Sequence, residues 1–120
     1  MEKEELKVLC EALKTFDIKQ INEIKTGYEK GLTIEQISLY AKPEFDVHQM
    51  QQILMAIRSG HFESAYLFAK PEFDSKQMYQ IWIGLHNGLS VSEVSTYANP
   101  RLDWTKMRNE RTILEKRFTK

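Results

Sequence analysis

Apolar residues recur along the chain with the spacing of one face of an α-helix. Residues are counted here from an opening apolar residue, position zero, and the four openings are Phe16, Phe45, Phe73 and Leu102. Positions five, eight and twelve are apolar in the first three blocks: Ile21, Ile24, Tyr28; Met50, Ile53, Ile57; and Met78, Ile81, Leu85. Because steps of three and four residues return to the same side of a helix, this stripe predicts the buried core.

The blocks are copies of one repeat of about 29 residues, a period typical of stacked helical hairpins. Asp follows each opening residue, and Gln or Lys comes three residues later: Asp17 and Gln20, Asp46 and Gln49, Asp74 and Gln77, Asp103 and Lys106. The first three copies then reach a glycine and close on an aromatic residue, Ala and, two residues on, Pro. These landmarks are Gly31, Tyr40 and Pro43; Gly60, Phe68 and Pro71; and Gly88, Tyr97 and Pro100.

The polar landmarks predict where the helices begin and end. Asp with Gln three residues later is an N-terminal capping pair, and glycine supplies the left-handed residue that ends a helix. Thr33 with Gln36, and Ser90 with Glu93, begin a second helix in the same way, and the following proline stops it. Each unit is therefore predicted to hold a helix of about thirteen residues, a tight turn and a helix of about eight.

The repeats predict one all-α domain of tandem helical hairpins, forming a short α-solenoid or a compact helical bundle of about eight helices. Position eleven is small in three units (Gly27, Ala56, Gly84), which predicts close approach of another helix. An irregular start is expected for the short helix near His61 and Phe62. A water-facing end is expected for the last unit, where Glu110 breaks the core stripe at position eight and Ile113 breaks the pattern of small residues at position eleven. The predicted units are an opening helix at 1–15, repeats at 16–44, 45–72 and 73–101, and a terminal helix at 102–120.

The motif Phe-Asp-x-x-Gln-Met, then Gly-Leu, then Tyr-Ala-x-Pro resembles a family of short tandem repeats in proteins of Firmicutes and their mobile elements. The resemblance covers residues 16–118, nearly the whole chain. It implies a bacterial, plasmid- or phage-associated context, in which small accessory proteins are often inhibitors or adaptors. Some of them act against host defence nucleases such as CRISPR effectors. For this chain, such a role is expected only by analogy.

The sequence offers no set of residues for catalysis, a cofactor or a metal. His48, His61 and His86 fall in different units, and Cys10 is the single cysteine. Helix capping explains the recurring aspartates more simply than acid–base chemistry does. We therefore expect a non-enzymatic protein without cofactor or metal. Its N-terminus lacks an apolar signal segment, so a cytoplasmic protein with no membrane partner is expected.

A helix-turn-helix regulator that binds DNA or RNA is the alternative function. Seven Lys or Arg residues lie between residues 101 and 120, although the whole chain has no net charge. Against this alternative, the second helices carry neither Lys nor Arg for phosphate contacts or guanine. Their polar residues are Glu35, Gln36 and Ser38 in one unit, and Ser92, Glu93, Ser95 and Thr96 in another.

A protein partner, or a nucleoprotein complex, is the interaction that the sequence favours. Positions two, six, nine and thirteen form a stripe about 100° around each long helix from the core stripe. Aromatic and basic side chains, the residues of interface hot spots, concentrate there in units three and four: Tyr79, Trp82, His86, Trp104, Arg108 and Arg111. Packing of one unit on the next is the competing explanation of the two tryptophans, whereas Arg108 and Arg111 are expected to be surface charges. For the oligomeric state, the sequence is compatible with both a monomer and a homodimer.

Overall fold

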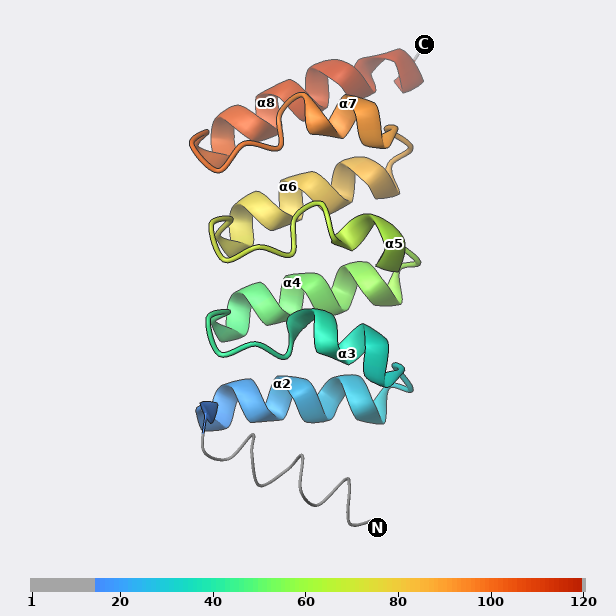
Figure 1. Cartoon of the computed structure of the whole chain (residues 1–120). Helices are drawn as coiled ribbons and strands as arrows, with labels where there is room; N and C mark the ends of the chain where they lie inside the picture. Colours follow the sequence, from blue (N-terminus) through green and yellow to red (C-terminus); the bar gives the residue numbers. More distant parts are fainter. Residues whose placement is uncertain (1–14, 120) are drawn as a thin grey trace.

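The computed structural model describes residues 15–119, and within that range the protein is all-α, as the sequence predicts. Long and short helices alternate along the chain (Figure 1). They are α2 (Ile18–Glu29), α3 (Ile34–Tyr40), α4 (Val47–Arg58), α5 (Phe62–Ala65), α6 (Ser75–His86), α7 (Val91–Ser95), α8 (Trp104–Glu115) and the 3₁₀-helix η1 (Lys116–Thr119). The opening helix predicted at 1–15 lies outside the described residues apart from Thr15.

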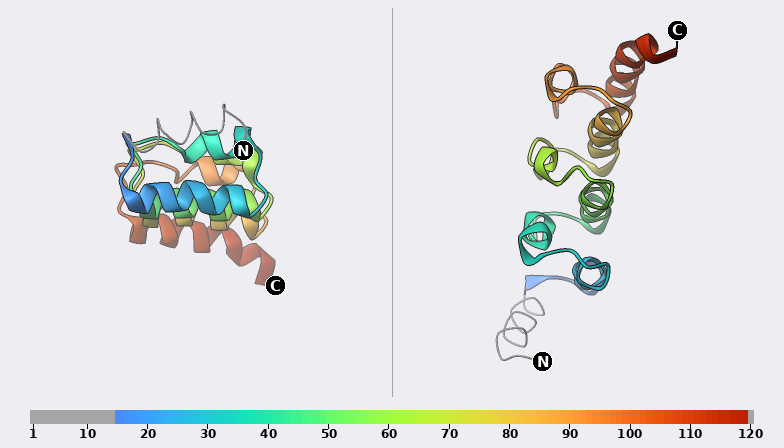
Figure 2. Two further views of the ribbon diagram at one scale, coloured as in Figure 1. Left: turned by 90° about the horizontal axis from the view of Figure 1, so that it is seen from below. Right: turned by 90° about the vertical axis from the view of Figure 1, so that its right-hand side faces the viewer.

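The helices form two layers. The long helices α2, α4, α6 and α8 lie side by side in one layer, and the short helices α3, α5 and α7 form the other (Figure 2). Each long helix packs on the next one, α2 on α4, α4 on α6 and α6 on α8. This row of hairpins is elongated, with principal dimensions of 55 × 25 × 18 Å.

The long helices begin at the predicted aspartates. The carboxylate of Asp46 accepts the Gln49 N–H at 2.8 Å, and the Gln49 side-chain oxygen accepts the Asp46 N–H at 2.8 Å. Asp17 with Gln20 and Asp74 with Gln77 form the same capping box. The fourth unit differs, because the Lys106 side chain has no acceptor. Asp103 accepts the backbone N–H of Thr105 instead.

The helix ends also follow the predicted landmarks. Gly31, Gly60 and Gly88 have φ of 86°, 92° and 107°, the left-handed conformation expected after each long helix. Thr33 and Ser90 cap α3 and α7 with the predicted boxes, whereas α5 has no side-chain cap at His61, in line with its expected irregular start.

The short helices contain seven, four and five residues, fewer than the predicted eight. The chain turns sharply after the aromatic residue that closes each unit. The N–H of Lys42 donates to the carbonyl of Tyr40 at 2.8 Å, and the other two units repeat this turn. A helix cannot continue through such a turn, so each short helix ends before its proline is reached.

Small residues at position eleven allow the predicted close approach, and the structure shows what fills the space. The Tyr97 hydroxyl donates to the Gln80 carbonyl at 2.7 Å, and a Cβ added to Gly84 would lie 2.2 Å from that hydroxyl oxygen. Tyr40 and Gly27 repeat the arrangement in the first unit. In the second unit the aromatic residue is phenylalanine, which leaves room for an alanine methyl.

The core stripe is confirmed in the middle of the stack, and it is wrong at one residue. Met50, Ile53, Met78 and Ile81 are completely buried, but Tyr28 is 59% exposed. Within residues 15–119, α2 is the first long helix and has one long-helix neighbour, α4, whereas α4 and α6 each have two. At the other end Glu110 and Ile113 are exposed, as predicted for the last unit.

The longest helix among residues 15–119 has twelve residues, and none is both long and apolar enough to cross a membrane.

Candidate partner-binding face

Three buried glutamines hold neighbouring units in a fixed register. Beyond its role in the capping box, each side chain donates through Nε2 to two carbonyls of the loop that leads into the next long helix. For Gln49 these are Pro71 at 3.1 Å and Phe73 at 2.6 Å. Gln20 and Gln77 make equivalent bonds, and all three are at least 93% buried. This glutamine ladder sets how each long helix is placed against the next.

Side chains at positions six, seven and nine meet in the seams between long helices. The Trp82 indole N–H donates to the Gln52 side-chain oxygen at 2.8 Å, which joins α6 to α4. Arg111 donates through Nε to the Gln80 side-chain oxygen at 2.9 Å, which joins α8 to α6. In the first seam, Gln51 donates to the Glu23 carboxylate at 2.9 Å. Position nine therefore packs one unit on the next.

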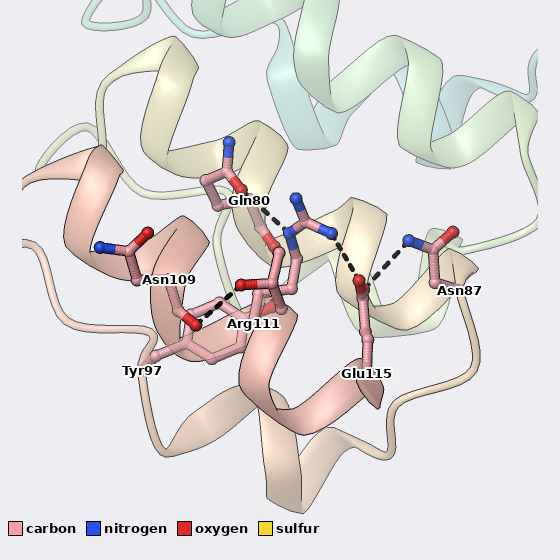
Figure 3. Close-up of polar contacts among 7 residues, drawn as sticks. Gln80, Asn87, Tyr97, Asn109, Arg111 and Glu115 are labelled. Atoms are coloured by element: carbon pink, nitrogen blue, oxygen red, sulfur yellow. Dashed lines mark hydrogen bonds and ion pairs between the residues drawn. The ribbon is translucent and has the colours of Figure 1, made fainter. Parts of the chain in front are cut away.

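The expectation that Arg111 is a surface charge is wrong. Its side chain is only 13% exposed, and it pairs with the Glu115 carboxylate at 2.7 Å while it bonds to Gln80 (Figure 3). Glu115 in turn accepts a hydrogen bond from Asn87 at 3.0 Å. Trp82 is 5% exposed, so its ring also belongs to a seam. The structure therefore favours the packing explanation for Trp82, and it places Arg111 in the next seam.

Four other side chains gather on the surface of the long-helix layer, and they are called the Trp104 face below. They are Lys76, Tyr79, Trp104 and Arg108. The Lys76 ammonium lies 5.4 Å and the Arg108 guanidinium 5.3 Å from the Trp104 ring centroid, within range of a cation–π interaction. Tyr79 is 38% exposed and meets Trp82 edge to face at 5.6 Å. An open depression in this surface is lined by Gln52, Ser75, Lys76, Tyr79, Gln80 and Trp104.

The charges of the Trp104 face are not neutralised by ion pairs. Neither Lys76 nor Arg108 forms a salt bridge with a carboxylate of residues 15–119. The neighbouring Asp103 is held by hydrogen bonds from the Thr105 hydroxyl and backbone N–H. These bonds, and to a lesser degree the charge of Lys76, hold the pKa of Asp103 below its usual value. A positive, partly aromatic surface is left open to solvent.

His86, the remaining predicted site residue, lies elsewhere. It is in the last turn of α6, ten residues and therefore ~15 Å along the helix from Lys76. Its ring contacts His61 of the preceding unit, with 3.1 Å between His61 Nε2 and His86 Nδ1. Burial, and then the nearby His86, lower the pKa of His61. Within residues 15–119, no three His, Cys, Asp or Glu side chains come together as metal ligands.

Several of the side chains that a helix-turn-helix protein would offer to DNA are engaged in local hydrogen bonds. Gln36 and Glu93 complete capping boxes, and the hydroxyls of Ser38 and Ser95 donate to carbonyls of their own helices at 2.7 Å. Glu93 also pairs with Arg117. These contacts leave few free groups for base recognition on α3 and α7.

The predicted stripe missed Lys76, Gln52 and Gln80 of the depression. Lys76 is at position three, and the two glutamines are at position seven. The sequence does contain a pattern that could have identified the two glutamines, because position seven is polar in every unit: Glu23, Gln52, Gln80 and Asn109. A polar residue that recurs beside a core stripe is typical of a hydrogen-bonded seam.

Comparisons of the chain with protein-family models, with curated proteins and with solved structures gave no match. The resemblance to the mobile-element repeat family therefore stays a prediction.

Proposed function

We propose that this protein is a non-enzymatic protein-binding module and that the Trp104 face is its contact surface. The supporting observation is a partly exposed cluster of aromatic and basic side chains that the repeat itself does not require. Position two is Ile18, Val47, Ser75 and Trp104 in successive units, and position six is Asn22, Gln51, Tyr79 and Arg108. Positions that vary while the capping residues and core recur are free to serve a partner.

The composition of the face suits protein recognition. Tyr, Trp and Arg dominate interface hot spots, because they bury a large area and keep polar or charged groups that select the partner. Within this class we assign the role of a small inhibitor or adaptor that acts on a protein or a nucleoprotein complex. This assignment rests on the resemblance of the repeat motif to proteins of mobile elements.

A pull-down from host lysate, with and without nuclease treatment, tests the proposal. The bait is the tagged full chain, compared with an Arg108→Glu variant. The matched control is Asn22→Glu, which introduces the same side chain at the exposed position six of unit one. Loss of a hot-spot contact of ~2 kcal/mol lowers affinity about 30-fold. We therefore expect a captured protein to be lost with Arg108→Glu, to persist with Asn22→Glu and to be insensitive to nuclease.

The nuclease arm addresses the alternative, a DNA- or RNA-binding regulator. Two of the basic residues between 101 and 120, Arg111 and Arg117, are committed to ion pairs with Glu115 and Glu93. This reduces the charge available for phosphates. Capture that disappears after nuclease treatment, or equal loss of capture in both variants, would contradict the proposed contact surface.

A further inference from the structure

We infer that the Trp104 face takes a short acidic protein segment in which carboxylates flank an apolar side chain. This inference rests on the proposed function and deepens it by naming the chemistry of the partner. Three features of the face carry it: its two cations, the depression beside Trp104 and the amide donors that line this depression.

The cations select carboxylates. Lys76 and Arg108 both lie over the Trp104 ring, from α6 and α8 respectively, and neither has an ion-pair partner among the described residues. The ring holds the two charges close to one point on the surface. A segment with one carboxylate on each side of a central residue can therefore pair with both, and the Arg108 guanidinium can bind a carboxylate through two parallel hydrogen bonds.

The depression accepts the central apolar side chain. Tyr79 and Trp104 supply aromatic surface at its lining, and Tyr79 is steadied by its edge-to-face contact with the seam residue Trp82. An aromatic or aliphatic side chain that enters the depression buries apolar area against these rings, and this burial adds to the attraction of the charges.

Two glutamine amides can bind the backbone of the segment. The side-chain oxygens of Gln52 and Gln80 already accept hydrogen bonds from Trp82 and Arg111. Their Nε2 groups are not buried without a partner, because no described side chain has such an orphaned polar atom. Both residues line the depression, and the half-buried Gln52 offers a more accessible N–H donor to a peptide carbonyl there than Gln80, which is 4% exposed.

A nucleic-acid strand is the less suitable occupant. Strong binding to a phosphate backbone needs several cations in a row, and this face has two. A short acidic segment, in contrast, needs only two cations, one for each of its flanking carboxylates.

The test uses the full chain labelled with ¹⁵N and two synthetic peptides. In one peptide a central Phe is flanked on each side by two Glu residues, and in the other every Glu is replaced by Gln. We expect the acidic peptide to shift the amide signals of Lys76, Tyr79 and Arg108 and the indole signal of Trp104. The Gln peptide should bind about tenfold more weakly, because two exposed ion pairs are lost.

Variants at matched positions assign the effect to the face. Lys76→Glu should weaken the acidic peptide about tenfold or more, whereas Lys19→Glu, the same change at exposed position three of unit one, should leave it unchanged. Circular dichroism confirms that both variants are folded.

Three results would overturn the inference: equal binding of the two peptides, equal effects of the two variants, or tighter binding of an oligothymidylate than of the acidic peptide. Equal binding of both peptides at the Trp104 face would leave the proposed function standing, because the face would still bind peptides. The pull-down, not the peptide titration, decides the proposed function itself.

Discussion

Tyr40 and Tyr97 each fill the space that a side chain at a neighbouring glycine would need. Their hydroxyls donate to carbonyls of the long helix of the same hairpin. Each ring therefore fits against its glycine only because the glycine has no side chain. The second repeat solves the same packing problem with Phe68 against Ala56, both completely buried. The second repeat thus lacks the tyrosine hydroxyl and has an alanine methyl group in its place. Relative to Gly84 and Tyr97, the pair Ala56 and Phe68 is a double variant that the chain already contains.

The exchange predicts a rescue. Gly84→Ala should lower the free energy of unfolding by about 2 kcal/mol, because the clash with the Tyr97 hydroxyl outweighs the ~1 kcal/mol that alanine contributes to a helix. Adding Tyr97→Phe should recover most of this loss, since the pair then matches Ala56 and Phe68. Urea denaturation of the single and double variants measures both effects. A Gly84→Ala protein as stable as the wild type would show that the contact is looser than the structure indicates.

At the scale of elements, one glutamine side chain both begins a helix and attaches it to the next unit. Gln49 caps α4 through its oxygen and reaches the loop before α6 through its nitrogen. Gln36 makes the same capping box at α3 but has no bond to another unit in the described structure, and it is more exposed. The two residues therefore separate capping from attachment.

We expect Gln49→Ala to lower the free energy of unfolding by about 2–4 kcal/mol, because two carbonyls in the loop lose their donor in addition to the cap. Gln36→Ala should cost only about 0.5–1 kcal/mol, the effect of a weakened cap. Thermal and urea unfolding of the two variants provide the comparison. Equal losses would mean that the bonds of Gln49 to Pro71 and Phe73 contribute nothing to stability.

The candidate site could be predicted from the sequence only in part. Tyr79 and Arg108, at position six of the predicted stripe, are exposed, and Trp104, at position two, is half-buried. Trp82 and Arg111 share that stripe at position nine, yet they lie in seams. The periodicity of one helix shows how its residues are arranged around the helix axis. It does not show which side of the helix a neighbouring helix covers.

At the scale of the whole molecule, burial is concentrated in the middle of the stack. α4 and α6 each contain six buried residues, whereas α2 contains two and α8 contains one. In a row of units that contact only their neighbours, stability is approximately the sum of local terms and interfaces. α2 and α8, which contain fewer buried residues, are therefore expected to open at a lower free energy than α4 and α6.

Native-state hydrogen exchange tests this gradient. The amides of α4 and α6 should exchange slowest, with opening free energies close to that of global unfolding, and those of α2 and α8 should exchange faster. Uniform protection across all four long helices would instead show that the stack unfolds as one cooperative unit. The comparison uses the same sample, so no variant is required.

The sequence by itself determined the all-α class, the helix starts and the glycine-terminated turns, because capping boxes and left-handed glycines depend on bonds between residues a few positions apart. It also identified the core stripe of the middle units. Only the tertiary structure decided which flank residues lie in seams and which form the Trp104 face. That choice depends on the rotation of one unit against the next, and this rotation is set by bonds between residues 22 to 25 positions apart.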